Sequence, residues 1–300
     1  MYGCGYPRPA FLAITDAPQD LAGPLPGDLA EQVSRALRED VGPGDVTARL
    51  IAANATAHAT VLCRDAAMVC GTGWFDETFR QLDSAVQVHW RARDGTVVQP
   101  GTVLCELNGP ARALLTGERT ALNFLQLLSG TATLTARYVA AVAGTGCRIL
   151  DTRKTLPGLR TAQKFAVRCG GGVNHRFGLY DRVLIKENHI AAAGSIQAAV
   201  ASARRLSPAL LVEVEAENLA EVAGALAARC DSILLDDFPP AALHEAVTLN
   251  RAAPQPAILE ASGGVSLATI AAIAATGVDF ISIGSLTKHV QAVDLSMRLS

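Results

Sequence analysis

The sequence LLVEVEAENLAEVAGALAARCDSILLDDF, residues 210–238, decides the fold. It contains an apolar strand at 210–217, an alanine-rich helix and a second apolar strand at 232–238, and both strands end in acidic residues. Short apolar strands separated by helices predict βαβ units and a parallel sheet. The same alternation continues on both sides, with further strands expected at 148–154, 182–189, 257–264 and 280–287.

Nearly all of these strands end in polar or charged residues. In a β/α barrel the active site lies at the carboxyl ends of the strands, and the turns after the last two strands often bind phosphate. An open doubly wound sheet also binds ligands there, but the sequence has no G-x-G-x-x-G turn and no G-x-x-x-x-G-K-[ST] loop. With six strands instead of eight, we expect an open, incomplete TIM-like β/α barrel.

The region before residue 130 predicts a different module. Residues 28–38 and 73–82 carry apolar side chains at helical spacing. Around these helices, short strands are expected at 55–64, 66–71, 84–90 and 102–109. We therefore expect an α/β protein in two parts, with a sandwich-like α+β domain ahead of the barrel.

The boundary between the two parts is expected at Ser129-Gly130. This pair interrupts the helical pattern of 117–143 and predicts a joint between two helices. We expect the tail at 289–300 to return to the N-terminal domain. The resulting division is a loosely ordered extension rich in proline and glycine, an N-terminal α/β domain and a catalytic barrel, at 1–26, 27–130 and 131–288.

The composition excludes several classes of protein. Half of the residues are hydrophobic and 18% are charged, which excludes a largely disordered chain. A net charge of -2 gives no overall basic field for binding nucleic acid or an anionic membrane. The apolar run at 11–14 is too short for a secretory signal or a membrane span. The seven scattered cysteines predict reduced thiols in a cytoplasmic protein, with no zinc site expected.

Charge is segregated along the barrel, with basic residues concentrated in 148–186 and acidic residues in 210–237. Lys186 directly follows an apolar strand, so its side chain is expected in the barrel mouth. Glu213 and Glu215 alternate with valines and share one face, with Glu215 nearer the strand end, and Asp236 ends the next strand. These patterns predict an anion site beside a site for a cation such as Mg²⁺. Other charged residues are assigned to surface helices: Arg160, Arg168, Arg182, Glu217 and Glu221.

Three glycine-containing segments can bring backbone amides close to a ligand. GGGVNHR at 170–176 leads to His175 and Arg176, while SGG at 262–264 and GSL at 284–286 each lead from a strand into a helix. Free N–H groups at the start of a helix favour phosphate. Because SGG and GSL follow the last two strands, together they predict a phosphate site.

Several segments together resemble the quinolinate phosphoribosyltransferases, and the match runs from about residue 28 to the end. The resemblance implies an N-terminal α/β domain packed on an open α/β barrel, and a homodimer whose active site takes an arginine from the neighbouring subunit. The segments are EDVGPGDVT (39–47), TGERTALNFLQ (116–126), DTRKTLPGLR (151–160), QKFAVRCGGGVNHRFGLYDRVLIKENHI (163–190), LLVEVEAENL (210–219), ILLDDF (233–238), LEASGGV (259–265) and GVDFISIGSLTK (277–288).

The resemblance also implies roles for individual residues. The arginine given to the neighbouring subunit is Arg119. The quinolinate contacts are Arg153, Lys154, His175, Arg176 and Lys186. The contacts to Mg²⁺ and the phosphoribosyl group are Glu215 and Asp236, which together with Lys154 and Lys186 form the implied catalytic set. The contacts to the 5′-phosphate are Ser262, Gly263, Gly264, Gly284 and Ser285.

The implied reaction joins quinolinate to phosphoribosyl pyrophosphate (PRPP) and yields nicotinate mononucleotide, CO2 and pyrophosphate, with Mg²⁺ and without an organic cofactor. A related transferase that accepts nicotinate is an alternative, although the cluster of cations suits a diacid better. A second alternative is a non-catalytic barrel that binds phosphate. A third is a lipoyl or biotinyl carrier module at 94–109, but no lysine between residues 66 and 130 could carry the group.

Three positions depart from the family pattern. Asp237, Gln163 and Lys288 stand where asparagine, glutamate and histidine are more usual. We expect none of the three to touch the residues with implied roles, although Lys288 lies near the phosphate segment in the sequence.

Overall fold

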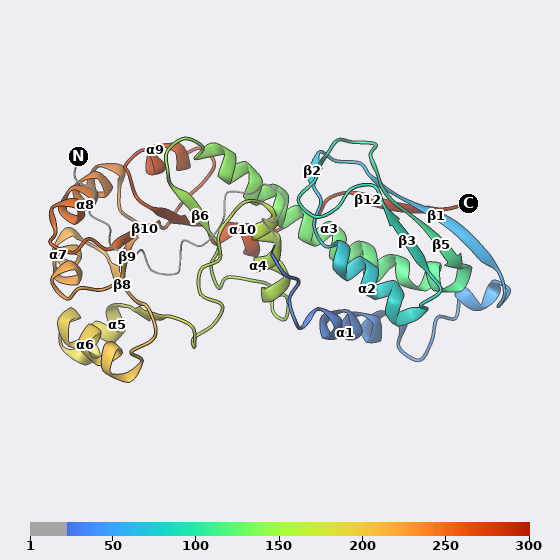
Figure 1. The fold of residues 1–300 in the computed structure, drawn as a ribbon, viewed down its shortest axis with the longest axis horizontal. Coiled ribbons are helices and arrows are strands. Elements are labelled where there is room, and N and C mark those ends of the chain that lie inside the picture. Colours follow the sequence, from blue (N-terminus) through green and yellow to red (C-terminus); the bar gives the residue numbers. More distant parts are fainter. Residues whose placement is uncertain (1–22) are drawn as a thin grey trace.

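The two larger sheets of the protein are joined by one long helix (Figure 1). The computed structural model describes residues 23–300, so most of the extension expected at 1–26 lies outside the described residues. Within 23–300, no helix is both long enough and apolar enough to cross a membrane.

A parallel sheet of six strands forms the C-terminal part. The strands are hydrogen-bonded in the order β6-β11-β10-β9-β8-β7, and every pairing is parallel. Because β6 and β7 remain as edges, the barrel is open. The predicted parallel sheet and its six strands are confirmed. Their bounds are β6 (Arg148–Leu150), β7 (Val183–Ile185), β8 (Val212–Ala216), β9 (Ser232–Asp236), β10 (Ile258–Ser262) and β11 (Phe280–Ser282).

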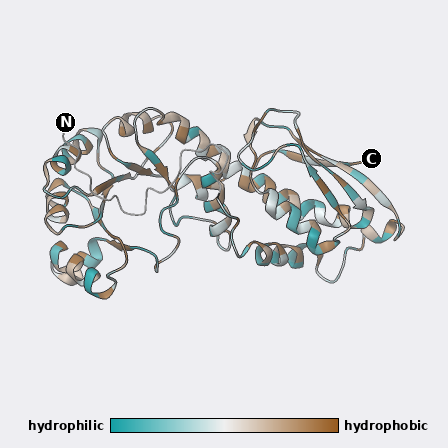
Figure 2. Ribbon diagram, in the orientation of Figure 1, coloured by the Kyte–Doolittle hydropathy of each residue, from teal (hydrophilic) through white to brown (hydrophobic). Residues whose placement is uncertain are grey.

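Helices cover the outer face of this sheet (Figure 1). Val212 and Val214 of β8 are fully buried in one core with Ile196 and Val222 of the outer helices. Successive side chains of a strand point to opposite faces, so the glutamates of β8 face the barrel interior. The strands are mostly hydrophobic, and the helices carry both kinds of residue (Figure 2). The helices are α4 (Arg160–Cys169), α5 (Glu187–Ala193), α6 (Ile196–Leu206), α7 (Leu219–Ala227), α8 (Pro240–Ala252), α9 (Ile270–Ala274) and α10 (Ser285–Lys288).

An antiparallel sheet with helices packed against it forms the N-terminal part. The predicted α+β module is confirmed. Its strand order is β12-β1-β5-β3, and a separate ribbon pairs β2 with β4. The C-terminal tail forms β12, in which Leu299 pairs with Ala59 of β1. The elements are α1 (Leu29–Val41), the 3-10 helix η2 (Ala48–Leu50), β1 (Thr56–Cys63), β2 (Ala67–Met68), α2 (Thr72–Leu82), β3 (Gln87–Trp90), β4 (Val97–Val98), β5 (Val103–Pro110) and β12 (Leu295–Leu299).

The helix α3 (Ala111–Ala141) runs from the N-terminal part into the barrel without a break. The prediction of a joint at Ser129-Gly130 is therefore wrong. The Ser129 hydroxyl accepts the N–H of Cys70 at 2.9 Å and donates to its carbonyl at 3.1 Å. A Cβ at position 130 would lie 2.1 Å from the carbonyl oxygen of Gln291, so only glycine lets the returning chain cross the helix here. Contacts with other segments therefore explain why serine and glycine stand inside this helix.

A shared core holds the two parts together. Trp74 of α2 packs on Phe165 of α4 with a centroid separation of 5.4 Å. The indole Nε1 of Trp74 donates to Gln32 Oε1 at 2.8 Å, and Gln32 Nε2 donates to Thr161 Oγ1 of α4 at 2.6 Å. The position of α4, which follows the first barrel strand, is therefore fixed by residues from both parts.

Candidate active site

The sequence-predicted residues lie along the carboxyl edge of the parallel sheet. Because all strands run the same way, their last residues meet at one edge. A lysine follows each outermost strand, while glycine turns and carboxylates occupy the middle. In spatial order across the sheet, the residues at or just after the strand ends are Lys154, Gly284, Ser262, Asp236, Glu215 and Lys186.

The turns after β10 and β11 bring backbone amides to this edge. Gly263 and Gly264 have φ angles of +95° and +53°, a region that glycine adopts most readily. A Cβ at Gly284 would lie 2.9 Å from Cδ of Lys154, so the lysine side chain crosses directly over this turn. The hydroxyl oxygen of Ser285 is buried and has no hydrogen-bond partner within residues 23–300. A lysine and a free hydroxyl at two glycine turns suit a phosphate group.

Asp237 contacts the first of these turns, so the expectation that the unusual residues stay clear of the site is wrong for it. Its φ is +55°, and its N–H donates to the carbonyl of Ser262 at 3.0 Å. A Cβ at Gly263 would lie 2.0 Å from Asp237 Oδ1. Aspartate and asparagine both tolerate this left-handed conformation, so the turn is kept while a negative charge is added beside it.

Glu215 and Lys186 form an ion pair at the other end of the edge. Lys186 Nζ donates to Glu215 Oε2 at 2.5 Å, and Glu215 is 9% exposed. Asp236 ends the adjacent strand β9. Two carboxylates on neighbouring strands supply the oxygen ligands that Mg²⁺ prefers, so these residues fit that metal.

Arg153 and Arg176 place two guanidinium groups near each other. Burial and the charge of Arg153 lower the pKa of Arg176. The Nε atom of Arg153 is buried and finds no hydrogen-bond partner in the described part of the chain. A buried donor without an acceptor is costly, so the group suits an anion that can accept from it. Two such cations favour a ligand with two carboxylates.

His175 is buried and both of its ring nitrogens are occupied. The N–H of Arg176 donates to Nδ1 at 2.7 Å, while Nε2 lies 2.9 Å from Glu213 Oε2 and 3.4 Å from Glu260 Oε2. Burial alone would lower the pKa of His175, but the carboxylates of Glu260 and Glu213 raise it to about 9. The carboxylates favour the charged ring, but Nδ1 accepts the N–H of Arg176 and so cannot also carry a proton. The geometry decides for a neutral ring with its hydrogen on Nε2. A direct contact of this ring with substrate stays a prediction.

Arg119 does not join this group within one chain. It is exposed on α3. A Cβ at Gly117 would meet Phe79 of α2, and Thr120 Oγ1 donates to Asp40 at 3.5 Å. Arg119 therefore lies among the N-terminal helices, and its predicted role requires a second subunit.

Two arginines assigned to the surface instead connect buried parts of the site, so that assignment is wrong. Arg182 is 6% exposed, and its Nη1 lies 3.5 Å from Glu213 Oε2. Arg160 donates to the carbonyls of Phe177 at 3.0 Å and Arg153 at 3.3 Å. In both cases acceptors from other segments compensate the burial of the charge.

Arg168 is the third arginine for which the surface assignment is wrong. It is half-buried, its Nη1 donates to Asn174 Oδ1 at 2.8 Å, and its guanidinium lies over the ring of Phe165. Glu217 and Glu221 do lie at the start of α7, where Glu221 accepts the N–H of Glu217 at 2.8 Å in an exposed contact. A charged residue near a strand end is thus buried only where another segment supplies its partner.

Sequence reasoning missed three buried charged residues beneath the site: Asp151, Lys164 and Glu260 are each at most 2% exposed. A signal was present in each case. Glu260 stands inside an apolar strand, Lys164 precedes Phe165 on the apolar side of a helix, and Asp151 directly follows the apolar pair at 149–150. A charge flanked by core residues in this way predicts a buried partner.

Two family models together match most of the chain. The N-terminal domain of quinolinate phosphoribosyl transferase matches residues 45–129, and the C-terminal domain matches residues 131–298. The chain belongs to the quinolinate phosphoribosyltransferase family. The resemblance of the quoted sequence segments is thereby confirmed.

Relatives of this family cover nearly all of the chain. A Bacillus subtilis protein named probable nicotinate-nucleotide pyrophosphorylase [carboxylating] is 43% identical over 260 residues, which are 86% of this chain and 89% of that protein. The human nicotinate-nucleotide pyrophosphorylase [carboxylating] is 38% identical over 277 residues, 91% of this chain and 92% of that protein. The solved nicotinate-nucleotide pyrophosphorylase of Francisella tularensis is 44% identical, with a TM-score of 0.89 over 93% of this chain and 99% of that one.

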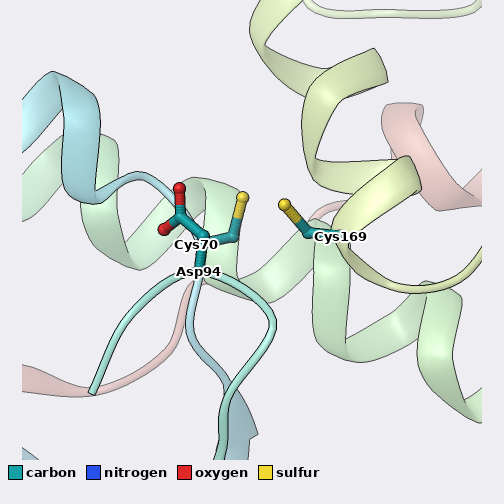
Figure 3. Close-up of side chains that lie close together, drawn as sticks. All are labelled: Cys70, Asp94 and Cys169. Atoms are coloured by element: carbon teal, nitrogen blue, oxygen red, sulfur yellow. The ribbon is translucent and has the colours of Figure 1, made fainter. Parts of the chain in front are cut away.

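In this member of the quinolinate phosphoribosyltransferase family, two thiols and a carboxylate lie close together (Figure 3). The sulfur atoms of Cys70 and Cys169 point toward each other, and both lie within 4.8 Å of a carboxylate oxygen of Asp94. Asp94 Oδ1 already accepts the N–H groups of Gly71 and Thr72, at 2.9 and 3.0 Å, at the start of α2. Burial raises the pKa of Cys70 well above its ordinary value. We interpret the thiols as neutral core groups.

The thiols are expected to be inert in the native protein. The six cysteines of the described chain are buried and free, and burial raises the pKa of Cys147 and Cys230 to about 12. The thiolate is the reactive form, so a Cys4→Ser variant should react with Ellman's reagent only as fast as it unfolds. The measurement compares native protein with protein in guanidinium chloride. A thiol that reacts in the native state at the rate of free cysteine would contradict this burial.

Proposed function

We propose that this protein transfers the phosphoribosyl group of PRPP to quinolinate and releases nicotinate mononucleotide, pyrophosphate and CO2, as a step of NAD biosynthesis. The observation that carries the proposal is that Arg153 and Arg176 lie at the same sheet edge as two glycine turns. The buried Nε of Arg153 has no hydrogen-bond partner within residues 23–300 and is free to bind an anion. This edge offers one place for a diacid and one for a sugar phosphate. The names of relatives at 38–43% identity support the assignment.

The acceptor is held on the basic side of the site. Arg153 and Arg176 bind the two adjacent carboxylates of quinolinate, with Lys154, Lys186 and His175 as the remaining contacts. Held in this way, the ring nitrogen is aimed at C1 of the ribose. Nicotinate has a single carboxylate and would leave one guanidinium without a partner, so the diacid is the better ligand.

The donor occupies the side of the glycine turns. Ser262, Gly263, Gly264, Gly284 and Ser285 bind the 5′-phosphate of PRPP. Glu215 and Asp236 would hold Mg²⁺, which when bound would neutralise negative charge on the leaving pyrophosphate. The bond from C1 to pyrophosphate breaks, and the quinolinate nitrogen forms the new bond to the oxocarbenium-like ribose. Lys154 and Lys186 add positive charge near the phosphates.

Bond formation at nitrogen prepares the loss of CO2. The alkylated ring is a pyridinium, which accepts the electron pair of the breaking bond between C2 and its carboxylate. CO2 leaves, and a proton replaces it at C2. The ring itself is the electron sink, so we propose that no organic cofactor takes part.

The active form we propose is a cytoplasmic homodimer. Arg119 is exposed on α3 and lies among the N-terminal helices of its own chain. From there it can reach the active site of a neighbouring subunit as a further cation for the acceptor. A two-fold dimer gives two such sites, each built from both chains.

The test is an endpoint assay of purified protein with quinolinate, PRPP and Mg²⁺. Nicotinate mononucleotide is followed by mass, and CO2 by label in the C2 carboxylate. Product should require all three components and disappear with EDTA. Product from nicotinate instead of quinolinate would select the alternative acceptor, and binding of PRPP without any product would select the non-catalytic barrel.

Replacing Asp237 by asparagine is expected to lower the KM for PRPP. The Asp237 carboxylate lies against Gly263, so it repels a phosphate bound at this turn. Exposed charges interact weakly, by about 0–1 kcal/mol, so we expect a decrease of about two- to fivefold. The measurement is the initial rate against PRPP concentration at low and high salt, because salt screens the repulsion.

The matched control is Glu245→Gln, which removes an exposed negative charge on the outer helix α8. This variant changes the net charge equally and leaves the glycine turns untouched. An equal decrease of the KM for PRPP in both variants would assign the effect to net charge. An unchanged KM in Asp237→Asn would show that the Asp237 carboxylate does not repel the bound phosphate.

A further inference from the structure

We propose that Asp151 and Lys164 are a positioning pair, whose buried contact holds residues 174–176 against β6 and so sets the spacing of Arg153 and Arg176. The inference rests on the proposed function, in which these arginines hold the two carboxylates of the acceptor. Both side chains of the pair are 0% exposed, so neither reaches the acceptor itself. Their effect on acceptor binding is indirect.

Asp151 connects strand β6 to the segment that carries His175. Its Oδ1 accepts the N–H of His175 at 2.8 Å, and its Oδ2 accepts from Nδ2 of Asn174 at 2.6 Å. The N–H of Asp151 in turn donates to the carbonyl of Val173 at 3.1 Å, where the chain forms a parallel bridge to β6. The carboxylate therefore extends the backbone pairing beyond the end of the strand.

Lys164 of α4 contacts the same segment, residues 174–176, from its other side. Its Nζ forms an ion pair with Asp151 and donates to the carbonyl of His175 at 2.9 Å. The carbonyl of Lys164 accepts from Nδ2 of Asn174 at 2.9 Å, and Nζ lies 5.0 Å from the centroid of the Phe177 ring. The pair thus binds both the N–H and the carbonyl of His175, which fixes the two peptide groups on either side of this residue.

The same helix also contacts the loop after β6, which carries the other arginine. Arg160 of α4 donates to the carbonyl of Arg153 and to that of Phe177. Arg176 follows His175 directly, and its N–H donates to the ring of that histidine. Both guanidinium groups are therefore carried by backbone that is tied to α4, within one connected set of hydrogen bonds.

Stability alone does not explain a charged pair at this place. Burial raises the pKa of Asp151 and lowers that of Lys164, so desolvation opposes both charges. Replacing a buried ion pair by uncharged groups of similar shape is often neutral for stability. What uncharged groups cannot reproduce is the set of directed bonds to Asn174 and His175. The role that remains for the charged pair is to orient residues 174–176.

The test compares wild-type protein with Lys164→Met and with the neutral pair Asp151→Asn/Lys164→Met. The double variant leaves no unpaired buried charge and is expected to fold even if the single variant does not. We expect the KM for quinolinate to rise about 10- to 100-fold, because small misplacements of binding groups have effects of this size. The KM for PRPP should stay within about twofold, since the glycine turns keep their contacts. Calorimetry of quinolinate binding gives a readout apart from turnover.

The matched control is Leu243→Ala, which removes a side chain of the barrel core that is 1% exposed and belongs to α8. It should lower the thermal stability and leave both KM values unchanged. A normal KM and normal binding of quinolinate in the folded double variant would overturn the positioning role, as would an equal rise in Leu243→Ala. Wild-type protein that makes no product would overturn the proposed function, and this inference with it.

Discussion

Arg153→Ala is expected to lower kcat/KM for quinolinate by about 10²- to 10³-fold, because removing one partner of a buried charged contact costs about 2–5 kcal/mol. The fold should survive this change. Arg153 Nε has no hydrogen-bond partner within residues 23–300, so its deletion leaves no acceptor of the protein unpaired. The measurement is steady-state kinetics with each substrate varied, beside a thermal unfolding curve.

The matched control for this substitution is Arg205→Ala. Arg205 is an exposed arginine of α6 that donates to Ser202 at 3.1 Å. Its removal changes the net charge equally and is expected to leave kcat/KM unchanged. Wild-type turnover in Arg153→Ala would remove this residue from the acceptor site, and an equal loss in both variants would assign the effect to charge alone.

The barrel could be predicted from the sequence because its strands are covered on both faces. Such strands appear as short apolar runs, and the first polar residue after each run marks its carboxyl end. Parallel pairing then places Lys186, Asp236 and Gly284 at one edge without any knowledge of the register. The placement of the candidate site along the sheet therefore followed from sequence pattern alone.

The single helix α3 could not be predicted in the same way. A serine followed by glycine is locally unfavourable in a helix, by about 1 kcal/mol for the glycine. The compensation comes from segments distant in the sequence, namely the backbone of Cys70 on Ser129 and the carbonyl of Gln291 beside Gly130. Local propensity contains no information on either contact.

The partners of the buried charges beneath the site could not be predicted for the same reason. A local pattern can indicate that Lys164 is buried, but it does not show that Asp151 accepts Lys164, or that Glu213 accepts Arg182, in the interior. Only the tertiary structure shows that these side chains are compensated. The sequence predicted the polar residues at the carboxyl edge of the sheet, and the ion pairs buried beneath them appeared only with the fold.

Arg119→Ala is expected to lose activity by orders of magnitude although Arg119 is exposed and lies among the N-terminal helices of its own chain. In the proposed dimer each site uses Arg153 of one chain and Arg119 of the other. Arg119→Ala and Arg153→Ala proteins should therefore both be inactive alone. Mixed in equal amounts after subunit exchange, they should recover about one quarter of wild-type activity, because half of the dimers are mixed and each mixed dimer has one intact site.

A second mixture separates a shared site from simple contamination. A chain with both substitutions, Arg119→Ala/Arg153→Ala, is exchanged with an equal amount of wild-type protein. Every mixed dimer then lacks one required arginine at each site, so activity should fall from about one half of the undiluted value to about one quarter. Activity that stays at one half after exchange has been verified by mass would place Arg119 outside the active site of the neighbouring subunit.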